Sequence, residues 1–274
     1  MLKTRFSAKE SRSPVFSVRR LAVLPVAFIV ALLLLSPSGL SPEGAAAQSQ
    51  QFHMEPYDSN ITVNGDGSLS VEEILTYVYD SGSFHRGTRY WDLNRIEQIQ
   101  AVGVTEEANG LLTPYTETSY DPDASKSGQP GTFGTTTENG QFKVRWVYDY
   151  TSSASRTFHL KYRVPHAIKV YSDHDEFDWY AIPPNWAGPI SRSRARVTFP
   201  ASADTSAWTK TSVPKSEVTA QANSITWTAS SGLDQGFELG AKLPKGVVTA
   251  TQPSWQSGID AQNQYNDRVK PFVD

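Results

Sequence analysis

The chain has 274 residues, a formal net charge of −3 at pH 7 and no cysteine. A mildly acidic chain without a concentrated basic face argues against nucleic acid as the main partner. The lack of cysteine excludes a disulfide framework, a thiolate nucleophile and a cysteine-ligated metal centre. Stability must therefore come from packing, for which the sequence supplies 7 Trp, 12 Tyr and 12 Phe.

Residues 1–47 have the pattern of an export signal peptide or signal anchor. Basic residues up to Arg20 precede the uncharged run Leu21–Leu35, which falls short of the roughly 20 apolar residues of a comfortable bilayer span. Ala45 and Ala47 suit a signal peptidase cut before Gln48. The alternative is an uncleaved anchor. In both cases the basic flank stays inside, so we expect an exported protein, either at the extracytoplasmic side of a bacterial cell membrane or secreted.

Strand-like patterns come after the signal. Ser59–Asn64 and Leu69–Tyr79 flank Gly65-Asp66-Gly67, a sequence that suits a tight hairpin turn. Phe84–Leu93 and Glu97–Val104 predict a second pair of strands. The Gly-, Ser- and Thr-rich residues 109–139 are expected to be mostly loop.

Four further strands are predicted in the middle of the chain. Apolar side chains recur at every second position in Phe142–Tyr150 and in Phe158–Val164, and the short polar break between them predicts an antiparallel hairpin. Ala167–Tyr171 and Phe177–Ile182 come next, joined by the acidic connection Ser172–Glu176.

The C-terminal part continues the β pattern. Ile190–Pro200 places Arg192, Arg194 and Arg196 on one strand face, which we interpret as a solvated face; contact with an acidic partner or anionic lipid is the alternative. No helical period separates the strands, so residues 48–255 predict one all-β domain, an antiparallel β-sandwich with immunoglobulin-like two-layer architecture. Residues 256–274 are polar and unpatterned and predict a linker or tail. Short strands are expected at Ser224–Thr228, Gly236–Leu243 and Gly246–Ala250.

The densest polar cluster is the acidic segment 173–178. Such a group could bind a divalent cation or pair a general acid with a base. Adjacent residues of an extended chain point to opposite sides, however, so a solvated loop is the simpler interpretation. We expect no metal, no cofactor and no catalytic residue, and retain the segment only as a candidate binding site. Its polar residues are Asp173, His174, Asp175, Glu176 and Asp178.

Arg86 and Arg89 form a second candidate binding site. Guanidinium groups suit carboxylate or phosphate ligands. They equally suit a structural pairing with Glu72, Glu73 or Asp80 on the preceding strand, which we favour. A sugar-stacking platform of tryptophans is a further option, but buried tryptophans are the more common case. The residues of that option are Trp91, Trp179, Trp186 and Trp255.

Motifs along residues 52–250 resemble the N-terminal ectodomain of the predicted bacterial membrane proteins known as domain of unknown function 2207. The resemblance implies an exported β-sandwich of unknown biochemical role, usually tethered by a membrane helix on its C-terminal side. Residues 256–274 contain no such helix, so the anchor is either missing from the chain, absent from the protein or supplied by Leu21–Leu35. The matching motifs are Tyr57–Val63, Asp66-Gly67, Val71-Glu72-Glu73, Phe84–Arg89, Trp146–Tyr150, Phe158–Tyr162, Asp175–Trp179, Val197–Pro200 and Phe237–Pro244.

These observations favour a non-catalytic binding or sensory module of the cell envelope, associated with a membrane and facing an unknown protein or glycan ligand. The first alternative is an envelope hydrolase that uses the acidic segment 173–178. The second is a structural spacer. The fold alone does not distinguish them.

Overall fold

The computed structural model describes residues 49–121, 128–184, 186–200 and 209–269. All of them belong to the second of two compact units, which begins at Ala45. The predicted signal segment, with Leu21–Leu35, Ala45 and Ala47, lies outside the described residues. The expectation of a mainly β structure is confirmed, because the described residues form sixteen strands and one helix.

The largest sheet has eight strands, and its strands show why the sequence folds this way. In β2, every second residue from Leu69 to Tyr79 is buried, Glu73 included, while the residues between them are more exposed. Period-two alternation of this kind buries one face of a sheet. The strand order is β14 (Glu217–Gln221), β15 (Ser224–Ala229), β12 (Ser193–Thr198), β1 (Gln51–Val63), β2 (Leu69–Ser81), β9 (Ser155–Val164), β4 (Gln100–Ala108) and β5 (Leu111–Pro114).

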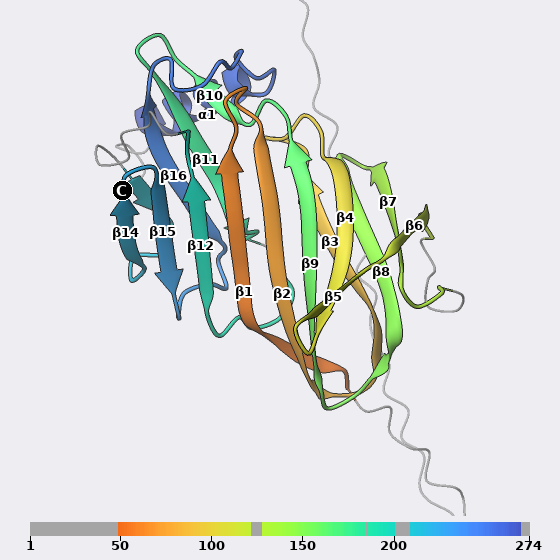
Figure 1. Ribbon diagram of the computed structural model, residues 1–274. Helices are drawn as coiled ribbons and strands as arrows, with labels where there is room; N and C mark the ends of the chain where they lie inside the picture. Colours follow the sequence, from red (N-terminus) through yellow and green to blue (C-terminus); the bar gives the residue numbers. More distant parts are fainter. Residues whose placement is uncertain (1–48, 122–127, 185, 201–208, 270–274) are drawn as a thin grey trace, which may run out of the picture. The chain divides into compact units, whose positions relative to one another are not determined.

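Two four-stranded sheets pack against the large one (Figure 1). The first sheet is β10 (Ile168–Val170), β11 (His174–Ile182), β16 (Phe237–Pro244) and β13 (Thr209–Thr211). The second sheet is β3 (Phe84–Asp92), β8 (Gln141–Thr151), β7 (Thr132–Glu138) and β6 (Thr116–Ser119).

Aromatic contacts join the layers into one core. Trp91 of β3 meets Tyr162 of β9 with ring centroids 4.8 Å apart, and Phe177 of β11 meets Phe199, next to β12, at 5.8 Å. Edge-to-face pairs of this type add to the free energy gained by burying apolar area. The domain is therefore a sandwich with one broad layer and two smaller sheets opposite it.

The prediction that residues 142–164 form one hairpin is wrong. Both strands exist, but β8 pairs with β3 and β7, whereas β9 pairs with β2 and β4. Strands β3 and β4 were also expected to pair with each other, but they lie in different sheets. Alternation shows that a strand has one buried face. It does not show whether two such strands are sheet neighbours or face each other across the core.

Three other details differ from the sequence-based expectation. Two of the three sheets are mixed, since β1 runs parallel to β12 and β6 parallel to β7. Parallel neighbours need a long connection, and most of the domain lies between β1 and β12. Residues 109–139, expected to be mostly loop, contain β5, β6 and β7. The acidic segment does not form a connection, because β11 begins at His174.

The segment expected to be a polar linker or tail instead forms helix α1 (Gln256–Val269). Its first residue, Gln256, is buried and binds both backbone groups of Val170 in β10, accepting from the amide at 2.8 Å and donating to the carbonyl at 3.0 Å. The Tyr171 hydroxyl donates to Asp260 one turn further along. These side-chain bonds fix the helix to the sheet edge, and a hydropathy pattern does not reveal them.

Candidate functional site

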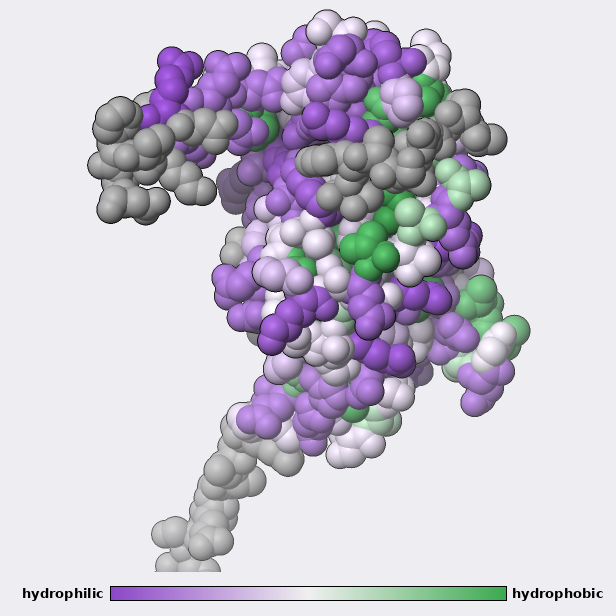
Figure 2. All heavy atoms as spheres, turned by 90° about the vertical axis from the view of Figure 1, so that its left-hand side faces the viewer, coloured by the Kyte–Doolittle hydropathy of each residue, from purple (hydrophilic) through white to green (hydrophobic). Residues whose placement is uncertain are grey.

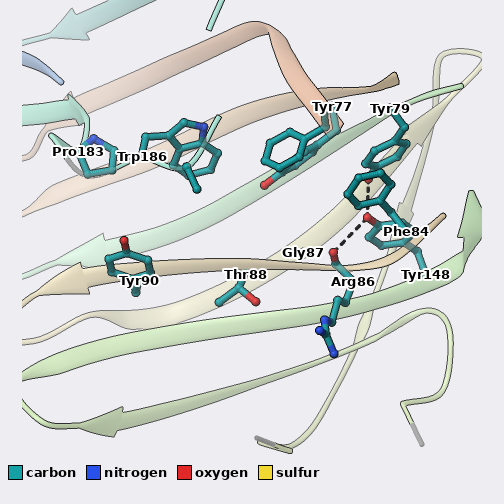
Figure 3. A pocket seen from close by; sticks show the side chains of 12 residues that line it. Tyr77, Tyr79, Phe84, Arg86, Gly87, Thr88, Tyr90, Tyr148, Pro183 and Trp186 are labelled. Atoms are coloured by element: carbon teal, nitrogen blue, oxygen red, sulfur yellow. Dashed lines mark hydrogen bonds between the residues drawn. The ribbon is translucent and has the colours of Figure 1, made fainter. Parts of the chain in front are cut away.

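The candidate site is a cleft beside β3 that consists of two adjoining hollows. The first, which we call the aromatic hollow, has a volume of about 170 Å³ and is shown in Figure 3. The second, the polar hollow, has a volume of about 340 Å³. Tyr90 and Pro183 line both. Concave sites of this size with a few polar groups are where ligands usually bind. The aromatic hollow is walled by Phe52, Tyr77, Tyr79, Phe84, Tyr148 and Trp186.

The rings of the aromatic hollow come from four strands and from the segment after β11. Tyr77 and Tyr79 occupy inward positions of β2, and Phe84 at the start of β3 stacks on Tyr79 with centroids 4.5 Å apart. Phe52 of β1 lies 5.5 Å from Tyr77. Trp186, in the segment after β11, lies 6.5 Å from Tyr77 on the other side. The hollow is therefore the place where the aromatic core of the sandwich reaches the surface.

The hydroxyl groups of this hollow are tied to one another. Tyr148 donates to the carbonyl oxygen of Arg86 at 3.1 Å, and the Tyr79 hydroxyl bonds to that of Tyr148 (Figure 3). Burial is the main cause that raises the pKa of Tyr148, to about 12. Both hydroxyls therefore remain protonated at neutral pH and add no charge to the hollow.

Gly87 lets the core approach β3 closely. A Cβ atom at this position would lie 2.1 Å from Cζ2 of Trp146. Real Cβ contacts are never that short, so the position requires glycine for steric reasons. The glycine of the Phe84–Arg89 motif is thus explained by the buried indole behind it.

The polar hollow combines charged and aromatic side chains. Arg95, in the turn after β3, donates to Asp178 at 2.9 Å and to Glu238 at 2.8 Å, and its guanidinium lies 5.6 Å from the ring of Tyr180. Asn94 also lines the polar hollow, and this residue is exposed. This hollow can offer hydrogen-bond donors and acceptors to a bound group.

Below the polar hollow lies a buried ion pair. Arg89 and Glu73 are 2% and 1% exposed, and they meet at 3.0 Å (Nε to Oε2) and 3.1 Å (Nη2 to Oε1). Tyr57 and Tyr162 donate to the same carboxylate at 2.8 and 2.6 Å. Burial alone would lower the pKa of Arg89, but the Glu73 charge outweighs it and raises that pKa. A structural pairing of Arg86 and Arg89 with Glu72, Glu73 or Asp80 was expected. The structure pairs Arg89 with Glu73, whereas Arg86 lines the aromatic hollow.

The acidic segment does not gather its carboxylates at one point. Along β11, Asp175 lies on the face opposite to Glu176 and pairs with Lys245 at 2.8 Å. His174 contacts its neighbours Asp173 at 2.8 Å and Glu176 at 3.2 Å. In the described part of the chain there is no group of three or more His, Asp or Glu residues placed to hold a metal ion.

Asp178 is the one member of this segment that lines the cleft. Its Oδ2 atom receives Lys169 at 2.8 Å, Lys210 at 2.9 Å and Arg95 at 2.9 Å. Burial would raise the pKa of Asp178, but the charges of Arg95 and Lys169 outweigh this and hold the pKa well below its usual value. The carboxylate therefore stays ionised and serves to position its three cationic partners.

Several site residues could not be found from local sequence patterns. Arg95 and Glu238 are 143 positions apart, and no motif links them. Tyr77 and Tyr79 were visible only as alternating apolar positions of a predicted strand. Of the tryptophans considered for a sugar-stacking platform, Trp91 and Trp179 are only 4% and 7% exposed, so they belong mainly to the core, which was the favoured expectation.

Comparison with solved structures gives only distant likenesses. A protein from Parabacteroides distasonis classed as a protease shares 9% identity over 70% of this chain and 40% of its own, with a TM-score of 0.42. A protein from Legionella pneumophila classed as nutrient binding shares 10% sequence identity over 70% of this chain and 67% of its own, with a TM-score of 0.43. The M1 zinc metallopeptidase of Deinococcus radiodurans shares 15% sequence identity over 72% of this chain and 43% of its own, with a TM-score of 0.36.

The chain thus spans less than half of the first and third of these proteins. Their low scores support no inference about this chain. No match was found among curated proteins. None of the helices in the described ranges is long and apolar enough to cross a membrane.

A family model, in contrast, matches most of the domain. The model describes the predicted membrane protein (DUF2207) N-terminal domain and matches residues 53–241. The matched range includes β3, β11 and every cleft-lining residue except Phe52. Its description is consistent with association with a membrane. The chain belongs to this family of predicted membrane protein (DUF2207) N-terminal domains.

Proposed function

We propose that the domain is a non-catalytic ligand-binding module on the extracytoplasmic side of a bacterial membrane, and that its ligand occupies the cleft beside β3. The observation that carries this proposal is the aromatic hollow, where rings of the core line an open cavity of about 170 Å³. An apolar group that enters it leaves water and meets mainly aromatic rings. The adjoining polar hollow supplies groups that can fix the ligand's orientation.

The charge pattern of the acidic segment favours binding over catalysis. Asp175, Glu176 and Asp178 each lie within 4.0 Å of a lysine or arginine nitrogen. A general acid needs a pKa near the working pH, whereas the cationic neighbours of Asp178 lower its pKa. A hydrolase that uses this segment is therefore the weaker alternative. A plain spacer would not need an open aromatic cavity.

The extracytoplasmic placement rests on the sequence. Basic residues before Leu21–Leu35 favour retention of the N-terminal flank in the cytoplasm and export of the chain beyond the apolar run. The family description fits a membrane-associated protein. The binding site would then face the envelope, where protein and glycan ligands are both present.

Binding to the aromatic hollow can be tested with p-cresol, a phenol about the size of a tyrosine side chain. The full chain, labelled with 5-fluorotryptophan and held in lipid nanodiscs, gives one fluorine signal for each of its 7 tryptophans. We expect p-cresol to shift the signal of Trp186, assigned with Trp186→Phe. Ala187 lines the hollow and is exposed, so Ala187→Trp should fill it and abolish the shift.

The matched control is Ala220→Trp, the same change on exposed strand β14. Figure 2 shows the domain from that side, where the surface is mainly hydrophilic with scattered hydrophobic residues. This variant should respond to p-cresol as the wild type does. A Trp186 signal that does not move, or equal responses of the two variants, would rule out the aromatic hollow as a binding site.

A further inference from the structure

The cleft runs along the edge of β3 and does not lie over one of its faces. β3 is the terminal strand of its sheet, with β8 as its neighbour. A cleft over one face of a strand would be lined by every second residue. Here every residue from Arg86 to Asp92 lines one of the two hollows. The cavity therefore runs alongside the strand backbone.

The opposite wall of the cleft cannot close this edge as a strand would. Asp178, Trp179 and Tyr180 of β11 form one part of it, and the segment after β11 forms the rest, with Pro183, Pro184, Trp186 and Ala187. Proline has no backbone N–H and cannot donate to a ladder. The amide of Trp186 is directed back into its own segment, where it donates to the carbonyl oxygen of Pro183 at 3.3 Å. An edge strand beside such a wall offers its backbone to a separate chain.

Two side-chain bonds already reach backbone oxygens of β3. The Arg86 carbonyl accepts from Tyr148, and the Tyr90 carbonyl accepts from the Arg89 side chain. A carbonyl oxygen has two lone pairs, so the contact with Tyr148 does not exclude a second donor to Arg86.

From this geometry we propose that the ligand is an extended segment of a partner polypeptide that adds to the edge of β3 as a further strand. The proposal rests on the proposed use of this cleft and adds the class of ligand. Main-chain hydrogen bonds to β3 supply affinity, and side-chain hollows supply specificity. One large apolar side chain enters the aromatic hollow. A polar side chain farther along the segment reaches Asn94 and Arg95 in the polar hollow.

A polypeptide fits this cleft better than a glycan. Glycan recognition commonly uses an open aromatic face on which a sugar ring can stack. The tryptophans of the polar hollow, Trp91 and Trp179, are almost completely buried. The face of Trp91 is also covered by the guanidinium of Arg89, 4.3 Å from the ring centroid. The alternating donors and acceptors of a strand edge match another polypeptide backbone.

The test uses the full chain in lipid nanodiscs and a phage-displayed library of random 12-residue peptides. A selected peptide is synthesised and its affinity is measured by calorimetry. N-methylation removes a backbone donor, and only every second amide of an added strand faces its neighbour. Methylation of one alternating set of amides should therefore weaken binding at least tenfold, whereas methylation of the other set should change it less than threefold.

The protein variants give the second arm of the test. Ala187→Trp should weaken binding of the peptide at least tenfold, and Ala220→Trp should leave it unchanged. Hydrogen exchange should show new protection in residues 84–92 when the peptide is bound. Equal effects of the two methylated sets, or unchanged exchange in β3, would overturn strand addition.

The remaining outcomes separate this inference from the proposed function. If p-cresol binds and the library yields no peptide that depends on Ala187, the cleft is a binding site but its ligand is not a peptide. Binding of chitohexaose in place of any peptide would likewise overturn the polypeptide assignment in favour of a glycan. If neither p-cresol nor a peptide binds, the cleft itself is not a ligand site and both conclusions fail.

Discussion

The guanidinium of Arg89 and the carboxylate of Glu73 form a two-point ion pair inside the core, with nitrogen–oxygen distances of 3.0 and 3.1 Å. Removal of one partner from such a pair leaves a buried charge without compensation, which costs about 3–5 kcal/mol. We expect Arg89→Met to lower the free energy of unfolding by about that amount. Glu73→Gln/Arg89→Met should lose less than the sum of the single changes, with a coupling of about 2 kcal/mol. Urea-induced unfolding of the full chain, followed by tryptophan fluorescence, measures both; strictly additive losses would contradict the pairing.

Acid should weaken the domain through Asp178. Its pKa is depressed in the folded state, so its contribution is complete above the unfolded pKa, near the usual value of 3.8, and is lost as the pH falls toward the folded pKa. We expect the difference in unfolding free energy between wild type and Asp178→Asn to be largest at neutral pH. The difference should shrink as the pH falls below about 4. A difference that stays constant between pH 7 and pH 2 would show that Asp178 does not carry this linkage.

Gly87→Ala should destabilise the domain because of one contact. The added methyl group would lie 2.1 Å from Cζ2 of Trp146, and overpacking of a close-packed core costs about 1–3 kcal/mol or more. Gly103 is the matched control, because a Cβ there meets nothing within 4 Å. Thermal unfolding should show a clear loss for Gly87→Ala and almost none for Gly103→Ala. Trp146→Phe should reduce the penalty of Gly87→Ala, and an unchanged penalty would point to a backbone cause.

Helix α1 should detach from the sheet when Gln256 is shortened. Its side chain makes two bonds to the backbone of Val170 and is 1% exposed. Gln256→Ala removes both bonds and leaves two backbone groups of β10 without a side-chain partner. We expect faster hydrogen exchange in residues 256–269 and at Val170. Gln262→Ala, on the exposed side of the same helix, is the control and should exchange as the wild type does.

The sequence predicted the strands well and their neighbours poorly. Alternation located β2, β8, β9 and β12 within a few residues, because burial of one face leaves a period of two. The same signal could not distinguish a hairpin partner from a strand across the core, so β8 and β9 were assigned to one hairpin. The mixed sheets were missed for a related reason: parallel β1 and β12 are far apart in sequence, and no turn motif connects them.

The site was predictable only in part. A structural pairing of Arg86 and Arg89 was expected with Glu72, Glu73 or Asp80 of the preceding strand, and the sequence could not single out Glu73 as the partner of Arg89. The acidic segment attracted attention as a run of charges, yet the strand separates its members and pairs them with lysines from β10, β13 and the end of β16. The cleft could not be predicted, because it depends on how the edge of one sheet meets the segment after β11. That relation is a property of the assembled layers.

The most direct test of the account is labelling of Ala187→Cys in intact cells with a membrane-impermeant maleimide. The chain has no cysteine of its own, so the new thiol is the single target. Ala187 lines the aromatic hollow. We predict labelling in intact cells that p-cresol slows, whereas Ala220→Cys should be labelled in the same cells at a rate that p-cresol does not change. Labelling only after lysis would contradict the extracytoplasmic placement, and equal labelling rates of Ala187→Cys with and without p-cresol would contradict the binding cleft.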